Sequence, residues 1–451
     1  MITTSVQQHL PNHCKPTCLL GYFALLVFST LLFGCQPKVF LMPTPVGLQP
    51  DGQIFKMTGD SQDDNLLYTL YATNRKPYDK LDSSSGYTIF PSDTLELGFV
   101  VHSVGDKDTT WDDLQKQSLK TNRDKDLPLN QKYVKEMVRY DKDDALNRTS
   151  SRADGFFDQI DRNIARSFNK DILVYVHGAN SSFYRATAMG AQYFHYSGHN
   201  SIVLTFSWPS AENLLKYKTD VLHAKQTVPA FARLIKILAL HTRARNINIL
   251  AYSAGAQVVT PGLAHLRDLY PALPSEELKK RLRIGEVYFA APDTDFKPFV
   301  KQYFKFKDII ERTTINLNRN DKVLRLSSIQ NGVSRLGRPN PAELSKEEEQ
   351  ILIAAMKTPR LDVLDVGGSE ALRLGGAHDS WYNHPWVSTD LFLLLFFNAS
   401  PEERGLEKFY YQNGAEGYHF PRDYDLKIKQ IINEHRKDIL PKAKPGQEAQ
   451  S

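Results

Sequence analysis

The sequence has 451 residues, of which 41% are hydrophobic and 24% are charged, the composition of a globular protein with a sizeable core. Its 56 basic and 51 acidic residues leave a formal net charge of +5, which is too balanced to indicate a nucleic-acid-binding protein. The length predicts one large α/β domain or two smaller ones.

The N-terminal segment has the features of an export signal. Lys15 precedes an apolar run at residues 19–33, which is close to the length of a signal-peptide core and shorter than the ~20 residues that a membrane-spanning helix needs. The run ends in Leu32-Phe33-Gly34-Cys35, which resembles the lipobox of bacterial lipoproteins. That resemblance implies a signal peptide over residues 1–34 and a membrane anchor through diacylated Cys35. A retained N-terminal anchor helix is the alternative.

The other cysteines and the residue after Cys35 fit export. Cys14 and Cys18 would be removed with the signal, so the mature chain would contain no disulfide and would depend on its core for stability. In Gram-negative lipoproteins an Asp after the cysteine retains the protein in the inner membrane, whereas this chain has Gln36. The resemblance therefore implies the outer membrane of the bacterial cell envelope, on its periplasmic or surface side. The prolines and glycines of residues 35–65 predict a lipid-anchored tether.

A folded domain is predicted over residues 66–440, followed by a disordered tail at 441–451. The apolar run Leu66–Arg75 and the alternating run Leu95–His102 predict two antiparallel strands. Residues 105–152 are charged and weakly patterned, which predicts a polar insertion on the surface with one helix.

Buried strands alternate with helices from residue 155 onward. Phe156, Ile160 and Ile164 recur at helical spacing. Near-continuous apolar strands then follow one another with helices between them, a pattern typical of a mainly parallel central sheet with helices on both faces. The expected fold class is therefore α/β. The predicted strands are residues 171–176, 201–209, 246–251, 286–291, 313–317 and 361–366.

Three helical segments have unusual features. Pro261-Gly262, in the helix after the 246–251 strand, predicts a kink or a break into two short helices. Residues 391–397 are very apolar but too short to span a membrane, so they predict a helix packed on the sheet. Glu347-Glu348-Glu349, in a polar stretch before the last strand, predicts a solvated helix face.

The strand 246–251 ends in a pattern that predicts a nucleophilic serine. Ala251-Tyr252-Ser253-Ala254-Gly255 places Ser253 among small residues, after a buried strand and before a helix. This is the pattern of a nucleophile elbow, a sharp strand-to-helix turn that exposes the hydroxyl group. The usual motif begins with Gly, so Ala251 is a departure. A serine there needs a base to take its proton, an acid to orient the base, and donors for the oxyanion.

The acid and the base are expected after later strands, in the order Ser, Asp, His. Asp321 follows the second strand beyond the elbow and is the preferred acid. Asp293 follows the first strand and is the alternative, with a helix N-cap as its other possible role. His378 lies in a glycine-rich loop after the last strand and is the preferred base. His384, just before the apolar helix, is the alternative.

Backbone N–H groups are expected to hold the oxyanion. One is the amide of Ala254, directly after Ser253. The other is the amide of Ala179, in the loop after the strand that ends at His177-Gly178.

No metal and no cofactor are expected. His195 and His199 are four residues apart, but no third ligand lies near them in the sequence. The sequence also contains no P-loop, dinucleotide-binding or zinc spacing. The expected partners are a small-molecule or lipid ester substrate and a membrane, through acylated Cys35.

Seven short motifs carry a family resemblance: Tyr71-Ala72-Thr73-Asn74-Arg75, Val176-His177-Gly178-Ala179-Asn180, Phe206-Ser207-Trp208-Pro209-Ser210, Tyr252-Ser253-Ala254-Gly255, Ala291-Pro292-Asp293, Asn320-Asp321-Lys322-Val323-Leu324 and Gly376-Ala377-His378. In this order they resemble a family of bacterial α/β-hydrolases, mostly described as of unknown function or as esterase/lipase-like. The resemblance covers about residues 66–398. It implies the α/β-hydrolase fold with Ser253, Asp321 and His378 as the triad, and it implies no known substrate.

The leading hypothesis is a serine hydrolase that acts on carboxylic esters. Ser253 would attack the acyl carbon, His378 would act as base and then as acid, and Asp321 would orient the imidazole. One alternative is a surface lipoprotein that uses the hydrolase fold as a binding module without catalysis. Another is an acyltransferase that passes the acyl group to an envelope glycan or lipid.

Overall fold

The computed structural model describes residues 38–48, 65–78, 86–120, 122–146, 150–340, 345–369, 372, 377–411 and 414–439. The chain divides into two units, Met1–Lys38 and Val39–Ser451, and the second contains all the elements below. The predicted signal peptide, the lipidation site Cys35 and the predicted tail at 441–451 lie outside the described residues. No helix in the described ranges combines the length and the hydropathy that crossing a bilayer requires.

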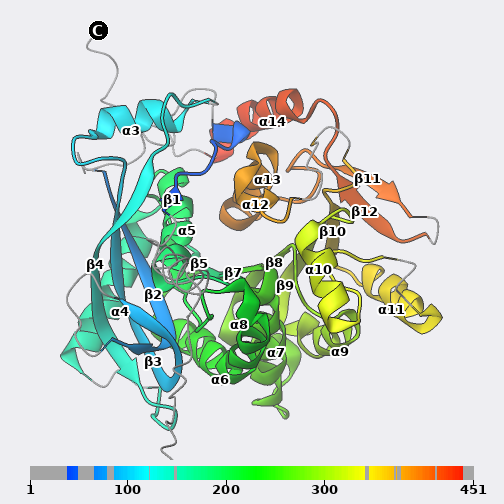
Figure 1. Cartoon of the computed structure of the whole chain (residues 1–451), viewed down its shortest axis with the longest axis horizontal. Helices are drawn as coiled ribbons and strands as arrows, with labels where there is room; N and C mark the ends of the chain where they lie inside the picture. The colour runs from blue at the N-terminus through cyan, green and yellow to red at the C-terminus, as the bar shows by residue number, and fades with distance from the viewer. Residues whose placement is uncertain are drawn as a thin grey trace, which may run out of the picture. The chain divides into compact units, whose positions relative to one another are not determined.

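A 12-stranded sheet forms the centre of the described part of the chain, in the order β1-β4-β3-β2-β6-β5-β7-β8-β9-β10-β12-β11 (Figure 1). Neighbouring strands are parallel from β2 through β12 in this order and antiparallel at both edges. The strands are β1 (Val39–Phe40), β2 (Leu66–Pro77), β3 (Tyr87–Val104), β4 (Pro128–Tyr140), β5 (Ile172–Val176), β6 (Ile202–Phe206), β7 (Ile247–Tyr252), β8 (Ile284–Ala290), β9 (Ile310–Leu317), β10 (Leu361–Asp365), β11 (Glu407–Tyr410) and β12 (Glu416–His419).

Helices cover both faces of this sheet, as the sequence predicts. Along β5, Ile172 and Val174 belong to the core that includes α4 and α6 to α9, while Leu173 and Tyr175 belong to the core that includes α5 and α13. Both faces are buried, so successive residues of the central strands are apolar. The helices are α3 (Trp111–Ser118), α4 (Ser151–Arg166), α5 (Phe183–Tyr196), α6 (Tyr217–His241), α7 (Ala256–Asp268), α8 (Ser275–Leu282), α9 (Phe296–Phe306), α10 (Lys322–Asn331), α11 (Lys346–Met356), α12 (Ser380–Asn383), α13 (Pro385–Phe397) and α14 (Tyr424–Ile439).

The apolar segment 391–397 is part of α13, which confirms the predicted packed helix. Its residues from Val387 to Phe396 are all buried. A helix that is apolar all round is expected where the protein surrounds it.

The predicted break into two short helices at Pro261-Gly262 is wrong, because α7 continues through both residues, and a kink there stays a prediction. Pro261 lies early in the helix, where its missing N–H removes one intrahelical hydrogen bond. Gly262 allows α6 to approach, since a Cβ atom there would lie 2.5 Å from the ring of Phe231.

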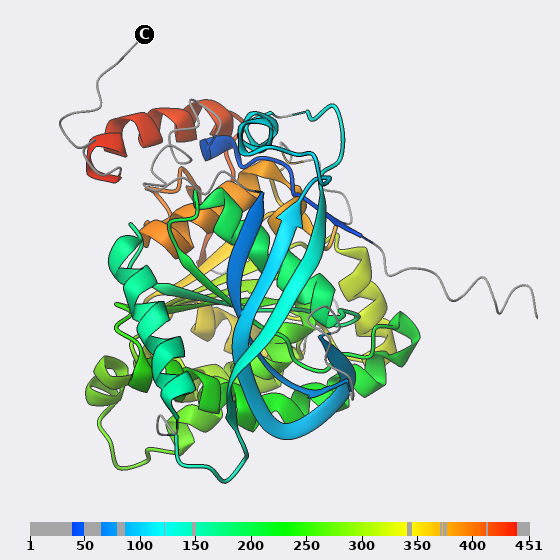
Figure 2. The same cartoon turned by 90° about the vertical axis from the view of Figure 1, so that its left-hand side faces the viewer.

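The predicted polar insertion at 105–152 contains a strand of the main sheet. β4 pairs with β3 on one side and β1 on the other, and Figure 2 shows the long strands β2, β3 and β4 twisting across the face turned to the viewer. The pairing of β3 with β4 shifts register between Leu97 and Gly98 and again between Val101 and His102. These irregularities interrupt the alternation of buried and exposed residues, which explains why the period of two is weak in the sequence.

The described part of the predicted tether, residues 39–48, is not a linker but packs into the core. Val39, Leu41 and Met42 are buried, and β1 pairs with β4. The guanidinium of Arg123 donates to the carbonyl oxygens of Leu41 and Met42, each at 2.7 Å. Prolines here mark an irregular segment at the edge of the sheet, where a missing N–H disturbs no ladder.

Candidate active site

The turn after β7 has a strained backbone at Ser253. β7 ends at Tyr252, the 3-10 turn η3 (Ser253–Gly255) follows, and α7 begins at Ala256. Ser253 has a φ of 51°, a left-handed conformation that costs a residue with a side chain about 1–3 kcal/mol. A turn of this kind raises the serine hydroxyl at the carboxyl edge of the sheet.

Small residues surround Ser253 because the backbone after β5 passes close to it. A Cβ atom on Gly255 would lie 2.6 Å from the carbonyl oxygen of Val176 and 2.8 Å from that of His177. A Cβ atom on Gly178 would lie 2.9 Å from the Cβ of Ser253. A larger residue at either glycine would therefore push the turn away from the loop that follows β5.

Ser253, His378 and Asp321 form one hydrogen-bonded chain. The Ser253 Oγ lies 2.8 Å from His378 Nε2, and His378 Nδ1 lies 2.7 Å from Asp321 Oδ2. The carboxylate can only accept, so we assign the proton to Nδ1, which leaves Nε2 to accept from the serine hydroxyl. Ser253 is 6% exposed and Asp321 is fully buried, so the chain lies largely out of bulk water.

Asp321 uses its two carboxylate oxygens for two tasks. Oδ2 accepts from His378, while Oδ1 accepts from the backbone N–H of Leu324 at 2.9 Å and caps α10. A side chain fixed at a helix N-terminus has little rotational freedom. The cap therefore orients the oxygen that faces His378.

The alternative acid, Asp293, is bound to other partners. Its carboxylate accepts from Arg335 Nε at 2.6 Å, from Ser327 Oγ at 2.7 Å and from the hydroxyl of Tyr217 at 2.8 Å. Its backbone N–H donates to the carbonyl oxygen of Ser253 at 3.0 Å. Asp293 thus supports the turn through its main chain, while its carboxylate binds Arg335, Ser327 and Tyr217.

The alternative base, His384, is the N-cap residue of α13. Its Nδ1 accepts from the backbone N–H of Trp386 at 3.2 Å, and burial lowers the pKa of its imidazole. The structure therefore brings together Ser253, Asp321 and His378, and gives His384 a capping role.

Aromatic rings pack beneath His378. The ring centroid of Tyr252 lies 5.3 Å from that of His378 and 4.9 Å from that of Trp381. Asn318 donates from Nδ2 to the carbonyl oxygen of Ala377 at 3.0 Å, which fixes the backbone directly before His378. The Tyr252 side chain is thus part of the packing that holds the imidazole.

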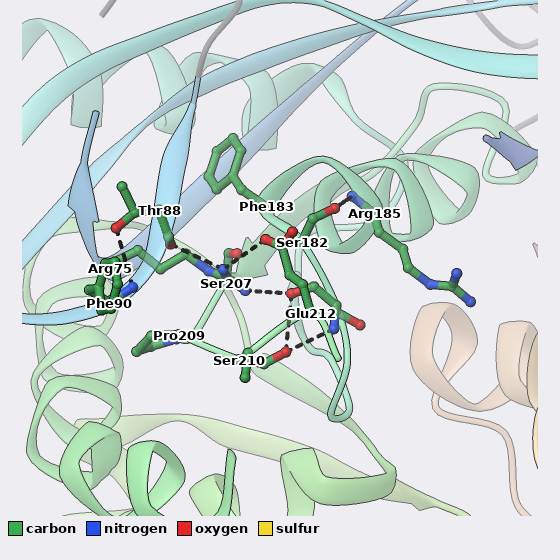
Figure 3. Close-up of polar contacts among 12 residues, drawn as sticks. Arg75, Thr88, Phe90, Ser182, Phe183, Arg185, Ser207, Pro209, Ser210 and Glu212 are labelled. Atoms are coloured by element: carbon green, nitrogen blue, oxygen red, sulfur yellow. Dashed lines mark hydrogen bonds and ion pairs between the residues drawn. The ribbon is translucent and has the colours of Figure 1, made fainter. Parts of the chain in front are cut away.

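The loop that carries the predicted oxyanion donor Ala179 is held by buried polar groups (Figure 3). Ser210 Oγ lies 2.8 Å from the backbone nitrogen of Ser181, which donates to it, and 3.2 Å from the Ser181 carbonyl oxygen. Asp220 accepts from the backbone N–H of Asn180 at 3.0 Å. Fixed backbone donors are what an oxyanion site requires. The second predicted donor, Ala254, is buried directly after Ser253.

Arg75 supports the same loop from the end of β2. Its guanidinium donates to the carbonyl oxygens of Ser181 at 2.7 Å and Thr88 at 3.2 Å, and it lies 3.7 Å from a carboxylate oxygen of Glu212. Arg75 is 1% exposed, and burial lowers the pKa of its guanidinium to about 10. A cation kept in the interior at neutral pH, with a fork of donors, rigidly connects β2 to the loop.

His177 is occupied by a structural contact. Its ring stacks on Trp208 with 5.1 Å between centroids, and Trp208 donates from Nε1 to the His177 carbonyl oxygen at 2.6 Å. Burial lowers the pKa of the imidazole to about 3, so it is neutral at ordinary pH. The two residues lock the ends of β5 and β6 together.

Sequence reasoning missed the parts played by Arg75, Ser210 and Asp220. The first two lie within the resemblance motifs at 71–75 and 206–210, so the family resemblance marked these positions but did not indicate what the side chains do. Asp220 lies inside a long helical pattern, and nothing local marks it. In the described ranges no group of three or more His, Cys, Asp or Glu side chains is placed to hold a metal ion.

Two comparisons with known proteins are informative. The sequence profile of a family described as "Alpha/beta hydrolase of unknown function (DUF900)" matches residues 153–389, a range that includes Ser253, Asp321 and His378. The chain is also similar to "Uncharacterized protein alr1448" of Nostoc sp., with 32% identity over 116 residues. That alignment covers 24% of this chain and 28% of the relative, so the chain spans little more than a quarter of that protein.

Proposed function

Because the chain belongs to this family of α/β-hydrolases of unknown function, we propose that it is a serine hydrolase that cleaves carboxylic esters. One observation carries the proposal. His378 lies between Ser253 Oγ at 2.8 Å and Asp321 Oδ2 at 2.7 Å, the relation of nucleophile, base and acid that acyl transfer to serine requires.

In the first half of the proposed reaction Ser253 is acylated. As Oγ bonds to the acyl carbon of the ester, its proton passes to His378 Nε2 and the carbonyl oxygen becomes an oxyanion. The amides of Ala254 and Ala179 hold that oxyanion. Asp321 keeps Nδ1–H in place and stabilises the imidazolium. The C–O bond to the alcohol then breaks, and His378 Nε2 returns the proton to the leaving alcohol.

In the second half water frees the acyl group. Water gives its proton to His378 Nε2 while its oxygen bonds to the acyl carbon. The bond to Ser253 Oγ then breaks and Oγ recovers the proton from Nε2. The products are a carboxylic acid and an alcohol, and the enzyme is unchanged.

Hydrolysis of para-nitrophenyl esters of graded acyl length tests the proposal. We expect the full-length protein to hydrolyse some of this series and Ser253→Ala to lower kcat/KM by about 10⁴-fold or more. Circular dichroism would check that the variant is folded. A Ser253→Ala protein that retains the wild-type rate would contradict the proposal. A wild-type rate that rises with added alcohol acceptors, with ester products, would identify an acyltransferase instead.

We also propose that the chain is anchored in the bacterial envelope through acylated Cys35. The support is the apolar run and the Leu32-Phe33-Gly34-Cys35 sequence, and two acyl chains on one residue suffice for stable anchoring. In a Gram-negative host, labelled palmitate should be incorporated into the wild-type chain and into Cys18→Ser, but not into Cys35→Ser. Equal incorporation into all three chains would argue against Cys35 as the site.

A further inference from the structure

Helix α10 exposes apolar side chains on the face that points away from the protein. Leu324, Ser327 and Ser328 form its buried side. At 3.6 residues per turn, Leu326 lies about 160° around the helix from Leu324. Leu326 is 56% exposed and Ile329 is 71% exposed. A surface helix of a soluble protein normally presents charged or polar residues at those positions.

A third exposed apolar side chain lies on a different segment. Leu215, in the 3-10 turn η2 (Leu214–Lys216), is 95% exposed. Two residues later the hydroxyl of Tyr217 lies 3.4 Å from Ser327 Oγ of α10 and donates to Asp293. The start of α6 and the helix α10 therefore touch through these two hydroxyl groups. Contiguous exposed apolar groups of this kind mark interaction sites.

The charged residues within these two segments are all basic. Residues 213–219 and 322–340 contain no Asp or Glu, and Lys216, Lys218, Lys322 and Arg325 are exposed. We call the exposed residues Leu215, Val323, Leu326, Ile329 and Val333, with these four cations, the α10 surface. Exposed apolar side chains can enter the boundary between headgroups and acyl chains, while neighbouring cations attract anionic headgroups.

The α10 surface borders the candidate active site. α10 begins directly after Asp321, whose carboxylate caps the helix and also accepts from His378. Ser327 Oγ donates to Asp293 in the segment after β8, so α10 lies near the carboxyl end of β8 as well as that of β9. Figure 1 shows α10 above α9 in that view. The N-terminal end of the α10 surface therefore lies close to the candidate active site.

We propose that the α10 surface binds the headgroup region of an anionic lipid bilayer and so holds the candidate active site against a lipid surface. Charge distinguishes this partner from a protein. The cores of protein interfaces are depleted of lysine, whereas lysine and arginine beside leucine are typical of interfacial helices. The inference concerns binding, and it holds whether or not Ser253 is a nucleophile.

Tryptophan quenching in the full-length protein tests where the chain meets the lipid. Ile329→Trp places a reporter on the α10 surface. Leu240→Trp is the matched control, because Leu240 is 62% exposed at the other end of α6, about 35 Å of helix away from Tyr217. Vesicles with brominated acyl chains are made of phosphatidylcholine alone or with phosphatidylglycerol. Any tether at the N-terminus affects both variants equally.

We expect the emission added by Ile329→Trp to be quenched in the phosphatidylglycerol vesicles and less in the neutral ones, and the Leu240→Trp emission to be unaffected in both. Equal quenching of the two variants, or none at residue 329, would overturn the proposal and leave the surface to a protein partner. Equal quenching at residue 329 in both kinds of vesicle would contradict the proposed preference for anionic lipid.

Charge-removing variants give an independent readout. In the Ile329→Trp background, we expect Lys322→Gln/Arg325→Gln to raise the concentration of anionic lipid that gives half-maximal quenching. The expected increase is about fivefold for each cation removed. Lys280→Gln/Arg281→Gln on α8, just before the amino end of β8, is the matched control and should change nothing. The same loss in both pairs would indicate a non-specific effect of net charge and would count against the proposal.

Discussion

Two aspartates that follow neighbouring strands of the sheet have opposite surroundings. Asp321, after β9, faces a histidine and a backbone N–H. Asp293, after β8, faces the guanidinium of Arg335 together with two hydroxyl groups. Both are buried at the same edge of the sheet. A position after a strand thus selects candidates for a catalytic acid, while the partner of the carboxylate decides which of them can orient a base.

The largest expected effect is on the rate of Asp321→Asn. An amide in place of Oδ2 can donate to the imidazole and so favours the tautomer with the proton on Nε2, which cannot accept from Ser253. We expect kcat/KM for an ester substrate to fall about 10⁴-fold, with an unchanged far-ultraviolet circular dichroism spectrum. A loss of less than about tenfold would show that Asp321 does not orient the base.

Asp293→Asn should instead affect stability. It leaves the buried Arg335 guanidinium without its main counter-charge, although Asp295 contacts the same guanidinium. We expect the free energy of unfolding in urea to fall by about 3 kcal/mol, and kcat/KM of the folded protein to stay within about tenfold of wild type. Replacing both partners, in Asp293→Asn/Arg335→Met, should recover part of the stability. A rate loss as large as that of Asp321→Asn would reverse the comparison.

Glu286 is a third buried carboxylate, and we expect its shifted pKa to affect stability and not catalysis. Burial raises the pKa of Glu286, in β8, from 4.5 to about 7, with the Arg404 guanidinium opposing the shift. Between these values the unfolded chain loses a proton that the folded chain keeps, so rising pH destabilises the fold, by about 3 kcal/mol over the whole range. We therefore expect the unfolding free energy of wild type to fall relative to that of Glu286→Gln as the pH rises from 4.5 to about 7. Equal pH dependence of the unfolding free energy in both proteins would contradict the raised pKa of Glu286. We expect the pH dependence of kcat/KM to be the same in wild type and in Glu286→Gln.

A smaller effect is expected at the loop that carries Ala179. Arg75→Lys keeps the charge but loses the forked contacts with Ser181 and Thr88, so the loop should hold the oxyanion less firmly. We expect kcat to fall by about 10- to 100-fold with little change in KM, somewhat less than the loss of an oxyanion donor itself. Arg139→Lys, where a half-exposed guanidinium pairs with the buried carboxylate of Glu96, is the matched control and should leave both constants unchanged.

Much of the fold could be predicted because buried parallel strands are apolar at nearly every position. That signal correctly located β5 to β10, and it placed Ser253, Asp321 and His378 after the ends of three of them. The strand β4 was missed because its register shifts break the alternation that identifies a half-exposed strand. The packed segment 39–48 was missed because its prolines are also typical of a linker.

The partners of the site residues could not be predicted from local pattern. Arg335 lies 42 residues from Asp293 and Arg75 lies 106 residues from Ser181, and nothing in either neighbourhood specifies the other. The choice between Asp321 and Asp293 depends on those contacts. It was therefore open in the sequence, and only the arrangement of the folded chain gives the two carboxylates different partners.

The most direct test of the proposed triad is the rate at which a fluorophosphonate probe labels the protein. We expect one adduct, mapped by mass spectrometry to Ser253, with a labelling rate that is close to wild type in Asp293→Asn, falls by orders of magnitude in Asp321→Asn and is zero in Ser253→Ala. An unlabelled wild-type protein, or an adduct on another residue, would contradict the assignment of Ser253 as the nucleophile.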